Sequence, residues 1–242
     1  MKLGIMQPYS FPYLGHFALI GLIDEWVVFD VTQYVPKSWI NRNRILDPKK
    51  EWQYISIPLV NSSRHIKISD ARIDNLALVK EYVLGKLSHY RKKAPFYKEV
   101  VSIVERTFDC CKDEYLVSFN LSGLKTICEY LGVKFRYNVL SKMDLNIPAN
   151  LGKGEWAPWV AKAFGAESYY NPIGGMALFD IADFQNEGIK LFYVAFKSFE
   201  YRVYGYRFQP DMSILDVLMW NSIESVKNAI QANTMVIDAS EK

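Results

Sequence analysis

Two prolines near the start of this 242-residue chain restrict what its first segment can form. Residues 3–6 are apolar and are typical of a short strand, Pro8 and Pro12 follow, and Gly15 and His16 then open an apolar helical pattern. Because proline fixes φ and lacks an amide donor, the segment between the two prolines can be neither a regular helix nor a central strand. The sequence therefore predicts a strand, a shaped loop and a helix. Loops of this kind, at the carboxyl ends of strands in open α/β sheets, bind ligands.

Strand and helix patterns alternate along the rest of the chain. Strands are predicted at residues 26–30, 54–60, 134–140, 169–173 and 189–196. Helices are predicted at residues 15–23, 75–107 with a break at Ala94-Pro95, 114–131, 156–164 and 213–230, the last capped by Asp211 or Ser213. Residues 31–50 are expected to form an irregular loop, and residues 199–208 a hairpin or an edge strand. Alternation of this kind predicts one α/β domain over residues 1–242. Its sheet is expected to be open, mostly parallel and Rossmann-like, with a helical subdomain at about 74–131 inserted or appended.

Composition narrows the function classes. Lys and Arg exceed Asp and Glu by only 29 to 26, so no nucleic-acid partner is predicted. The three cysteines have no metal-ligand spacing, and therefore neither a metal site nor a disulfide framework is expected. No apolar run is long enough to cross a membrane and no signal peptide is evident, which indicates a cytoplasmic protein without membrane insertion.

The opening loop is the first candidate binding site. Gln7 offers a donor and an acceptor together, and the phenols of Tyr9 and Tyr13 can bond sugar or phosphate oxygens. His16 stands at the predicted helix start, where it could carry a proton or meet a phosphate. Alternatively, the aromatic rings fold back onto the core and His16 is a satisfied structural histidine. Residues 13–16 also resemble faintly the histidine turn of Rossmann-like nucleotidyltransferases, with Tyr13 in place of the first histidine.

A second candidate site follows the strand at residues 26–30. Asp30 stands where α/β enzymes place carboxylates. Arg42 and Arg44 lie two apart and would point the same way in an extended chain, and two arginine forks suit a diphosphate. Alternatively, the arginines pair with Asp30, Asp47 or Glu51 in a solvated cluster. The candidate ligand-binding residues of this region are Gln33, Trp39, Asn41, Arg42, Asn43 and Arg44.

A third candidate is the segment Asn171-Pro172-Ile173-Gly174-Gly175, which follows a predicted strand. Paired glycines let a backbone approach a ligand closely, and they also make ordinary turns, so both interpretations stay open. Cys110 and Cys111 have no histidine or acid nearby in sequence and are expected to be structural thiols.

Taken together, these motifs resemble the WbqC-like family of bacterial surface-polysaccharide loci. The segments that carry the resemblance are Met6–Tyr9, Pro12–Gly15, the strand that ends in Asp30 with Gln33, Trp39–Ile45, Ile57-Pro58, Tyr90 to Pro95, Asn171–Gly175 and Leu215 to Asn221. They run in order across nearly the whole chain.

The resemblance implies work on the sugars of surface polysaccharides such as the O-antigen of lipopolysaccharide. The specific expectation is a transferase that forms an amide on a nucleotide-linked amino sugar by N-acyl or aminoacyl transfer. In this reading Asp30 or His16 takes a proton from the amine, the arginines hold the diphosphate and Trp39 stacks on the substrate. The acyl donor would be CoA-bound, bound to a carrier protein, or an adenylate made with ATP. The alternatives are a non-catalytic sugar-nucleotide-binding or scaffold protein and an ATP-using nucleotidyltransferase-like enzyme.

Overall fold

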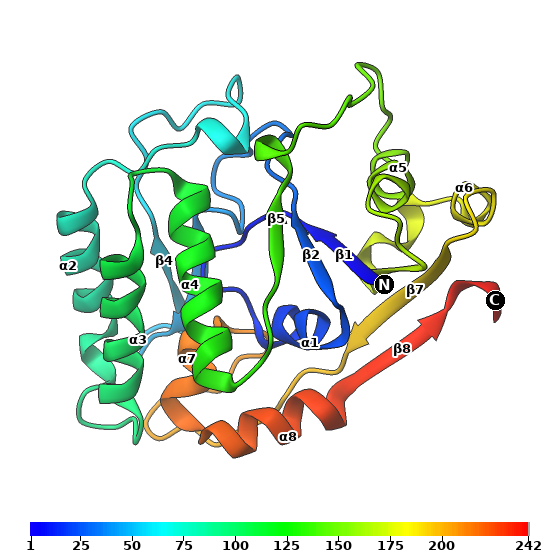
Figure 1. The fold of residues 1–242 in the computed structure, drawn as a ribbon. Coiled ribbons are helices and arrows are strands. Elements are labelled where there is room, and N and C mark those ends of the chain that lie inside the picture. Colours follow the sequence, from blue (N-terminus) through cyan, green and yellow to red (C-terminus); the bar gives the residue numbers. More distant parts are fainter. Residues whose placement is uncertain (242) are drawn as a thin grey trace.

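Six strands form one twisted sheet in the computed structural model, which describes residues 1–241 (Figure 1). The strands are β1 (Lys2–Met6), β2 (Glu25–Val28), β5 (Tyr137–Val139), β6 (Ser168–Pro172), β7 (Lys190–Phe196) and β8 (Thr234–Asp238). Their order is β5-β2-β1-β6-β7-β8, and β8 alone runs antiparallel to its neighbour. The predicted mostly parallel Rossmann-like sheet is confirmed. After β1 the chain adds β2 and β5 on one side of that strand, and it then adds β6, β7 and β8 on the other side. The direction in which strands are added therefore reverses between β1 and β6.

Alternation along the strands builds a core on each face of the sheet. Leu3, Ile5 and Val27 point into the layer covered by α5 (Trp156–Ala163) and α6 (Ile181–Gln185). Trp26 and Val28 point to the opposite layer, which belongs to the larger of the two hydrophobic clusters. That second face is covered by α1 (Leu14–Leu22) and α8 (Ile223–Asn233). The period-2 pattern of the strands therefore buries both faces, as a parallel sheet requires.

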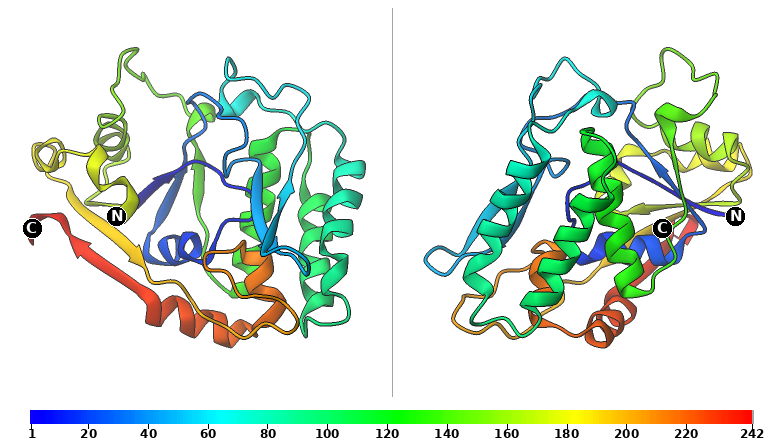
Figure 2. Two further views of the ribbon diagram at one scale, coloured as in Figure 1. Left: turned by 180° about the vertical axis from the view of Figure 1, so that it is seen from behind. Right: turned by 60° about the vertical axis from the view of Figure 1, so that its left-hand side comes forward.

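A helical block and a two-stranded ribbon complete the molecule at one side of the sheet (Figure 2). These elements are β3 (Arg42–Leu46), β4 (Trp52–Ser56), α2 (Leu76–Leu87), α3 (Tyr97–Cys110), α4 (Leu116–Leu131) and α7 (Ile214–Trp220). Helix α3 packs on α2, α4 and α7, and α4 also contacts α8. Short 3-10 turns occur at Ile68–Asp70, Ser88–Tyr90, Leu140–Lys142, Ile173–Leu178 and Ala239–Glu241.

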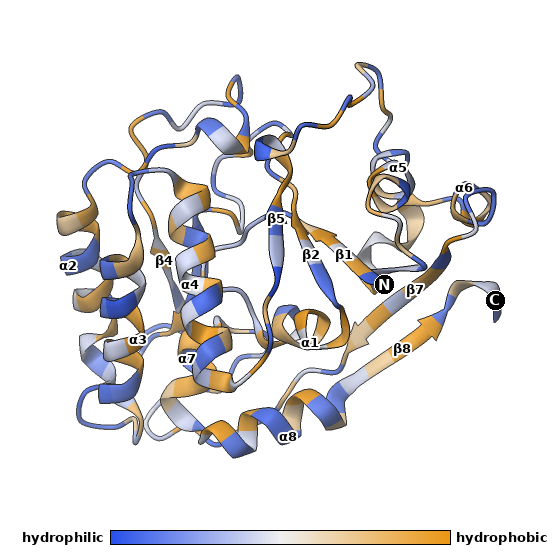
Figure 3. Ribbon diagram, viewed as in Figure 1, coloured by the Kyte–Doolittle hydropathy of each residue, from blue (hydrophilic) through white to orange (hydrophobic). Residues whose placement is uncertain are grey.

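The packing explains the hydropathy of the helices. Seven of the nine residues of α1 are buried, and α1 is almost uniformly apolar, whereas α3 and α8 alternate between apolar and polar residues (Figure 3). Helix α1 is enclosed between the sheet, α8 and the opening loop, so it has little solvent-facing surface. Helices α3 and α8 each keep one face in water, which gives the usual amphipathic pattern.

Three expectations about the elements are wrong, and one strand was not predicted. Residues 31–50 were expected to form an irregular loop but contain the strand β3. The strand was not recognised, because the polar Arg-Asn-Arg sequence gives no apolar alternation, although its side chains alternate between buried and half-exposed. The helix expected at 213–230 is two helices, α7 and α8, and Ser222 caps the second by accepting the Ser225 amide at 3.2 Å. Residues 199–208 form no strand; Phe199, Tyr201 and Tyr206 pack against the core, whereas Tyr204 is exposed. The strand β8 was not predicted at all.

Candidate functional site

A pocket of about 300 Å³ lies at the carboxyl ends of β1 and β7, and we call it the Arg44 pocket. The opening loop, the residues from Trp39 into β3, the last residue of β7 and the loop before α7 all contribute to it. The lining residues are Tyr9, Pro12, Tyr13, Trp39, Asn43, Arg44, Phe196 and Asp211. The structure therefore brings together five residues that the sequence separately indicated, namely Tyr9, Tyr13, Trp39, Asn43 and Arg44.

Two buried amide side chains hold the opening loop in place. Asn43 is 4% exposed, and its Nδ2 donates to the carbonyls of Ser10 and Phe11 at 3.1 and 3.0 Å. Its Oδ1 accepts the Arg44 amide at 2.8 Å. Asn43 was expected to bind a ligand, but both ends of its amide are used within the protein. Asn43 therefore holds the loop that forms one wall of the pocket, and its amide has no free group to offer a ligand.

Asn120 is the second anchor and was missed by the sequence analysis. This residue lies on α4, is 2% exposed, and donates from Nδ2 to the carbonyls of Pro8 and Ile40, both at 2.8 Å. Its Oδ1 accepts the Ser10 hydroxyl at 2.7 Å. The available signal was an amide between Phe119 and Leu121 in a predicted helix, because buried polar side chains are nearly always bonded.

Backbone strain is concentrated in this region. Phe11 and Asp211 adopt positive φ angles of 40° and 53°, which side chains with a Cβ rarely take. The carbonyl of Phe11 receives hydrogen bonds from Asn43 and, at 2.7 Å, from the Ser213 hydroxyl. Strain of this kind costs on the order of 1–3 kcal/mol per residue and persists where surrounding contacts enforce it. Its occurrence at a pocket points to a ligand site.

Arg44 presents unused hydrogen-bond donors to the pocket. Its guanidinium lies 5.6 Å from the ring centre of Trp39 and 5.5 Å from that of Trp52. One terminal nitrogen contacts the Asp211 carbonyl at 3.4 Å, and Nε is buried without a partner among residues 1–241. Arg44 is half-buried and forms no ion pair with any residue in 1–241, so an anion in the pocket could accept from its terminal nitrogens.

Tyr13 lies across the first turn of α1, and Gly15 makes this possible. A Cβ at Gly15 would be 2.5–2.6 Å from the Tyr13 ring and its hydroxyl. Burial raises the pKa of both Tyr9 and Tyr13, and the charge of Asp211 raises that of Tyr13 further. Both phenols therefore stay protonated and can donate to a ligand.

Arg42 lies on the same side of the β3–β4 ribbon but outside the pocket lining, with its guanidinium 3.9 Å from the ring centre of Tyr54. The two arginines point the same way, as expected from their spacing. The alternative of a solvated ion-pair cluster is wrong, because the acids have other partners. Glu51 pairs with Arg207 at 2.6 Å, and Asp47 accepts the amides of the turn that follows it.

Asp30 lies at the end of β2 and does not line the Arg44 pocket. It is 1% exposed, and its two oxygens accept the amide and the hydroxyl of Ser141 at 3.0 and 2.5 Å. Gln7 lies nearby and donates to Thr32 at 3.3 Å. Gln33 is exposed and donates to the Arg64 carbonyl. These residues form a group separate from the Arg44 pocket.

His16 is enclosed in the core at 3% exposure. Its ring centre lies 4.8 Å from that of Trp26 and 5.6 Å from that of Tyr9, and its Nε2 has no partner among the described residues. Burial lowers the pKa of His16 from 6.5 to about 3. The imidazole is therefore neutral near pH 7, and it is not among the residues that line the pocket.

The remaining predicted residues make local bonds. Asn171, at 6% exposure, accepts the Tyr169 hydroxyl at 2.9 Å and donates to the Pro172 carbonyl at 2.8 Å. Gly175 packs against Asn171 so closely that a Cβ there would clash, whereas a Cβ at Gly174 would meet open space. Asn41 donates to the Ile57 carbonyl at 3.3 Å, and its Oδ1 is buried without a partner within residues 1–241.

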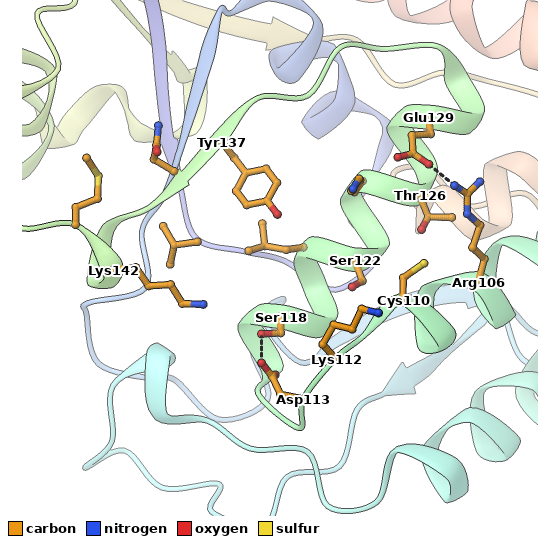
Figure 4. A pocket seen from close by; sticks show the side chains of 15 residues that line it. Arg106, Cys110, Lys112, Asp113, Ser118, Ser122, Thr126, Glu129, Tyr137 and Lys142 are labelled. Atoms are coloured by element: carbon orange, nitrogen blue, oxygen red, sulfur yellow. Dashed lines mark hydrogen bonds and ion pairs between the residues drawn. The ribbon is translucent and has the colours of Figure 1, made fainter.

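A larger cavity of about 630 Å³ lies between α4 and β5 (Figure 4). None of the residues predicted to form a site lines it. Among residues 1–241, no group of three or more His, Cys, Asp or Glu side chains is arranged to hold a metal ion. In the same part of the chain, no helix is both long and apolar enough to cross a membrane.

The fold and the pocket define an α/β protein with Rossmann-type strand order and a ligand-sized hollow at the carboxyl ends of its strands. The chain belongs to the WbqC-like protein family, whose model matches residues 7–228. It is also similar to the uncharacterized protein Rv1507c of Mycobacterium tuberculosis, with 27% identity over 219 residues that cover 90% of this chain and 92% of the relative. No solved structure matches the chain.

The amide anchor of the opening loop is testable by truncation. Replacing Asn120 with alanine leaves buried carbonyls at Pro8 and Ile40 without this donor, so the free energy of unfolding should fall by about 2–4 kcal/mol. Urea denaturation measures the change. The matched control is Asn228→Ala on the exposed face of α8, which should change stability by no more than about 0.5 kcal/mol. Equal denaturation midpoints for the two variants would contradict the anchoring role.

The buried histidine gives the stability a pH dependence. The unfolded chain binds a proton at His16 below about pH 6.5, whereas the folded chain does so only near pH 3. Stability from this group is therefore present above pH 6.5 and is lost as the pH falls, by about 2 kcal/mol between pH 8 and pH 5. Chemical denaturation at both pH values should show that loss in the wild type. It should be smaller by about this amount in His16→Phe and unchanged in His65→Phe, because His65 is exposed.

Proposed function

We propose that this protein binds a nucleotide-linked amino sugar in the Arg44 pocket and transfers an acyl or aminoacyl group to the sugar amine. The observation that carries the proposal is the guanidinium of Arg44, which forms no ion pair with any residue in 1–241 and lines a cavity together with aromatic rings and phenols. We propose with it a role in the biosynthesis of surface polysaccharides such as O-antigen, which is what the resemblance to the WbqC-like family implies.

The chemistry of the lining fits a sugar joined to phosphate. Arg44 would pair with a phosphate oxygen, for which a guanidinium fork is suited. Trp39 is 42% exposed at the rim and offers a flat surface for a sugar or a base. The phenols of Tyr9 and Tyr13 would donate to sugar hydroxyls. At about 300 Å³ the hollow is at the small end of ligand pockets, so it suits the sugar and its phosphate, with the base outside.

Asp211 is the one carboxylate in the lining of this pocket and is the base that we assign to the reaction. The sugar amine would attack the acyl carbonyl, a C–N bond would form and the bond to the leaving group would break. Asp211 would take the proton that the nitrogen releases. The donor would be a thioester on CoA or on a carrier protein, or an adenylate made with ATP. Asp30 and His16 are less favoured as bases, because both are buried and neither lines the pocket.

A second candidate is a sugar-nucleotide-binding protein without catalysis. The observation in its favour is that the pocket lining has a single carboxylate and no histidine, so only one group offers proton transfer. The nucleotidyltransferase-like alternative depended on His16 at the start of a helix, and the burial of that ring beside Trp26 does not support it.

Binding is tested at Arg44 with its neighbour as the control. Calorimetric titration with a UDP-linked or dTDP-linked amino sugar should give an affinity that falls at least tenfold in Arg44→Ala, because a charge-assisted hydrogen bond is lost. Arg42→Ala removes the same side chain two residues away on the same strand, but from a position stacked on Tyr54, and should change the affinity by less than about twofold. Equal losses in the two variants would contradict binding in the pocket.

Catalysis is tested at Asp211. Asparagine tolerates the positive φ of this position, so Asp211→Asn should keep the backbone and sugar-nucleotide affinity close to wild type. The rate of amide formation, followed by mass spectrometry with an acyl-CoA or with ATP and a free acid, should fall on the order of 10²–10⁴-fold. Asp144→Asn, in an exposed loop, is the matched control and should keep full activity. Sugar-nucleotide binding without amide formation by the wild type would establish the non-catalytic alternative.

A further inference from the structure

The cavity between α4 and β5 has its own chemistry. Strand β5 is the edge strand of the sheet, and the adjacent side of α4 faces it across the hollow (Figure 4). At about 630 Å³, the hollow is roughly twice the size of the Arg44 pocket. Tyr137 and Lys142 extend into it from the side of β5, and Ser118, Ser122 and Lys112 lie on the side of α4. We call it the α4–β5 groove.

The charges of the α4–β5 groove are mostly positive and partly unpaired. Four basic and two acidic side chains line it. Glu129 is neutralised by Arg106 at 2.5 Å, and the second acid, Asp113, accepts the Ser118 hydroxyl at 3.0 Å. The three lysines form no ion pair with any residue in 1–241, and they are Lys112, Lys125 and Lys142. Opposed lysines from separate segments create an attractive field for an anion between them.

Hydroxyl donors complete the lining. Ser118, Ser122 and Thr126 recur at intervals of four along α4, which places them on one face of the helix. The Ser118 hydroxyl already donates to Asp113, so Ser122 and Thr126 supply the hydroxyl donors of this face. The phenol of Tyr137 approaches from the opposite wall. Lysine ammonium groups and hydroxyls are donors to phosphate oxygens, and the apolar side chains of Leu121, Val139 and Met143 in the same lining offer surface to the rest of such a molecule.

We propose that the α4–β5 groove is a second ligand site that takes a phosphate-bearing molecule of nucleotide size. The proposal does not depend on the function proposed for the Arg44 pocket, because α4 separates the two. The side of α4 that carries Asn120 and Gly123 holds the opening loop, and a Cβ on Gly123 would lie 3.4 Å from Phe11. The serine face of the same helix lines the groove.

The experiment titrates three phosphate-bearing probes into wild type and variants by calorimetry. The probes are inorganic pyrophosphate, ADP and CoA. The double variant Lys112→Gln/Lys142→Gln removes one lysine from each side, and its matched control is Lys92→Gln/Lys153→Gln at exposed positions outside the groove. Arg44→Ala is a separate arm that removes the other proposed site. Thermal melting of each variant shows that it is folded.

The expected result is binding of at least one probe that weakens tenfold or more in Lys112→Gln/Lys142→Gln, while the control and Arg44→Ala keep wild-type affinity. Equal affinities for pyrophosphate and ADP would identify the phosphates as the recognised group, and tighter binding of ADP or CoA would add a contribution from the nucleoside or the longer arm. The inference is overturned if no probe binds, or if binding survives the double substitution. Loss of binding only in Arg44→Ala would also overturn it, since the phosphate would then occupy the Arg44 pocket.

Discussion

The buried amides of Asn43 and Asn120 are the interactions on which the pocket region depends. Between Pro8 and Pro12 the chain cannot pair its backbone in a helix or a sheet, so its carbonyls need other donors. The two side chains supply them to Pro8, Ser10 and Phe11. Together with the Ser213 hydroxyl, these bonds offset the strained φ of Phe11 and hold the loop that carries Tyr9 and Tyr13.

Successive side chains of the strand β3 point to opposite sides of the ribbon and have different roles. Asn43 points inward and bonds the loop, while Arg42 and Arg44 point to the other side among Trp52 and Tyr54. The ribbon is anchored to α7 by Asp216, whose buried carboxylate accepts the Leu46 amide at 3.1 Å. The hydroxyls of Tyr90 and Tyr201 donate to the same carboxylate. A supporting group and a ligand-facing group can therefore be neighbours in sequence without competing for the same partner.

The sequence predicted the sheet and most helices, because their signals are local periodicities that tertiary contacts reinforce. It also indicated five residues of the Arg44 pocket, since aromatic and arginine side chains in proline-rich or irregular segments are hard to explain by packing. It did not predict which polar residues serve the fold. Asn120 is 112 residues from Pro8 along the chain, and Asp211 enters the pocket from the far end of the sequence, so neither pairing has a local signal. Asp30 has a strong local signal but does not line the Arg44 pocket. A carboxylate at a strand end is typical of a site, but here the neighbouring edge strand brings Ser141 to bond it.

The state of Arg44 supports the proposal that the Arg44 pocket binds an anion. Burying a guanidinium nitrogen without an acceptor costs free energy, and the two tryptophans offset only part of it through cation–π contact. The nearest acid in the pocket, Asp211, contributes its backbone carbonyl and not an ion pair. The strained backbone of Asp211 and the strained, heavily bonded Phe11 occur in the same region. These costs therefore occur together around the Arg44 pocket. An anion that accepts from the terminal nitrogens of Arg44 would neutralise its charge, and this charge-assisted bonding would contribute to the affinity.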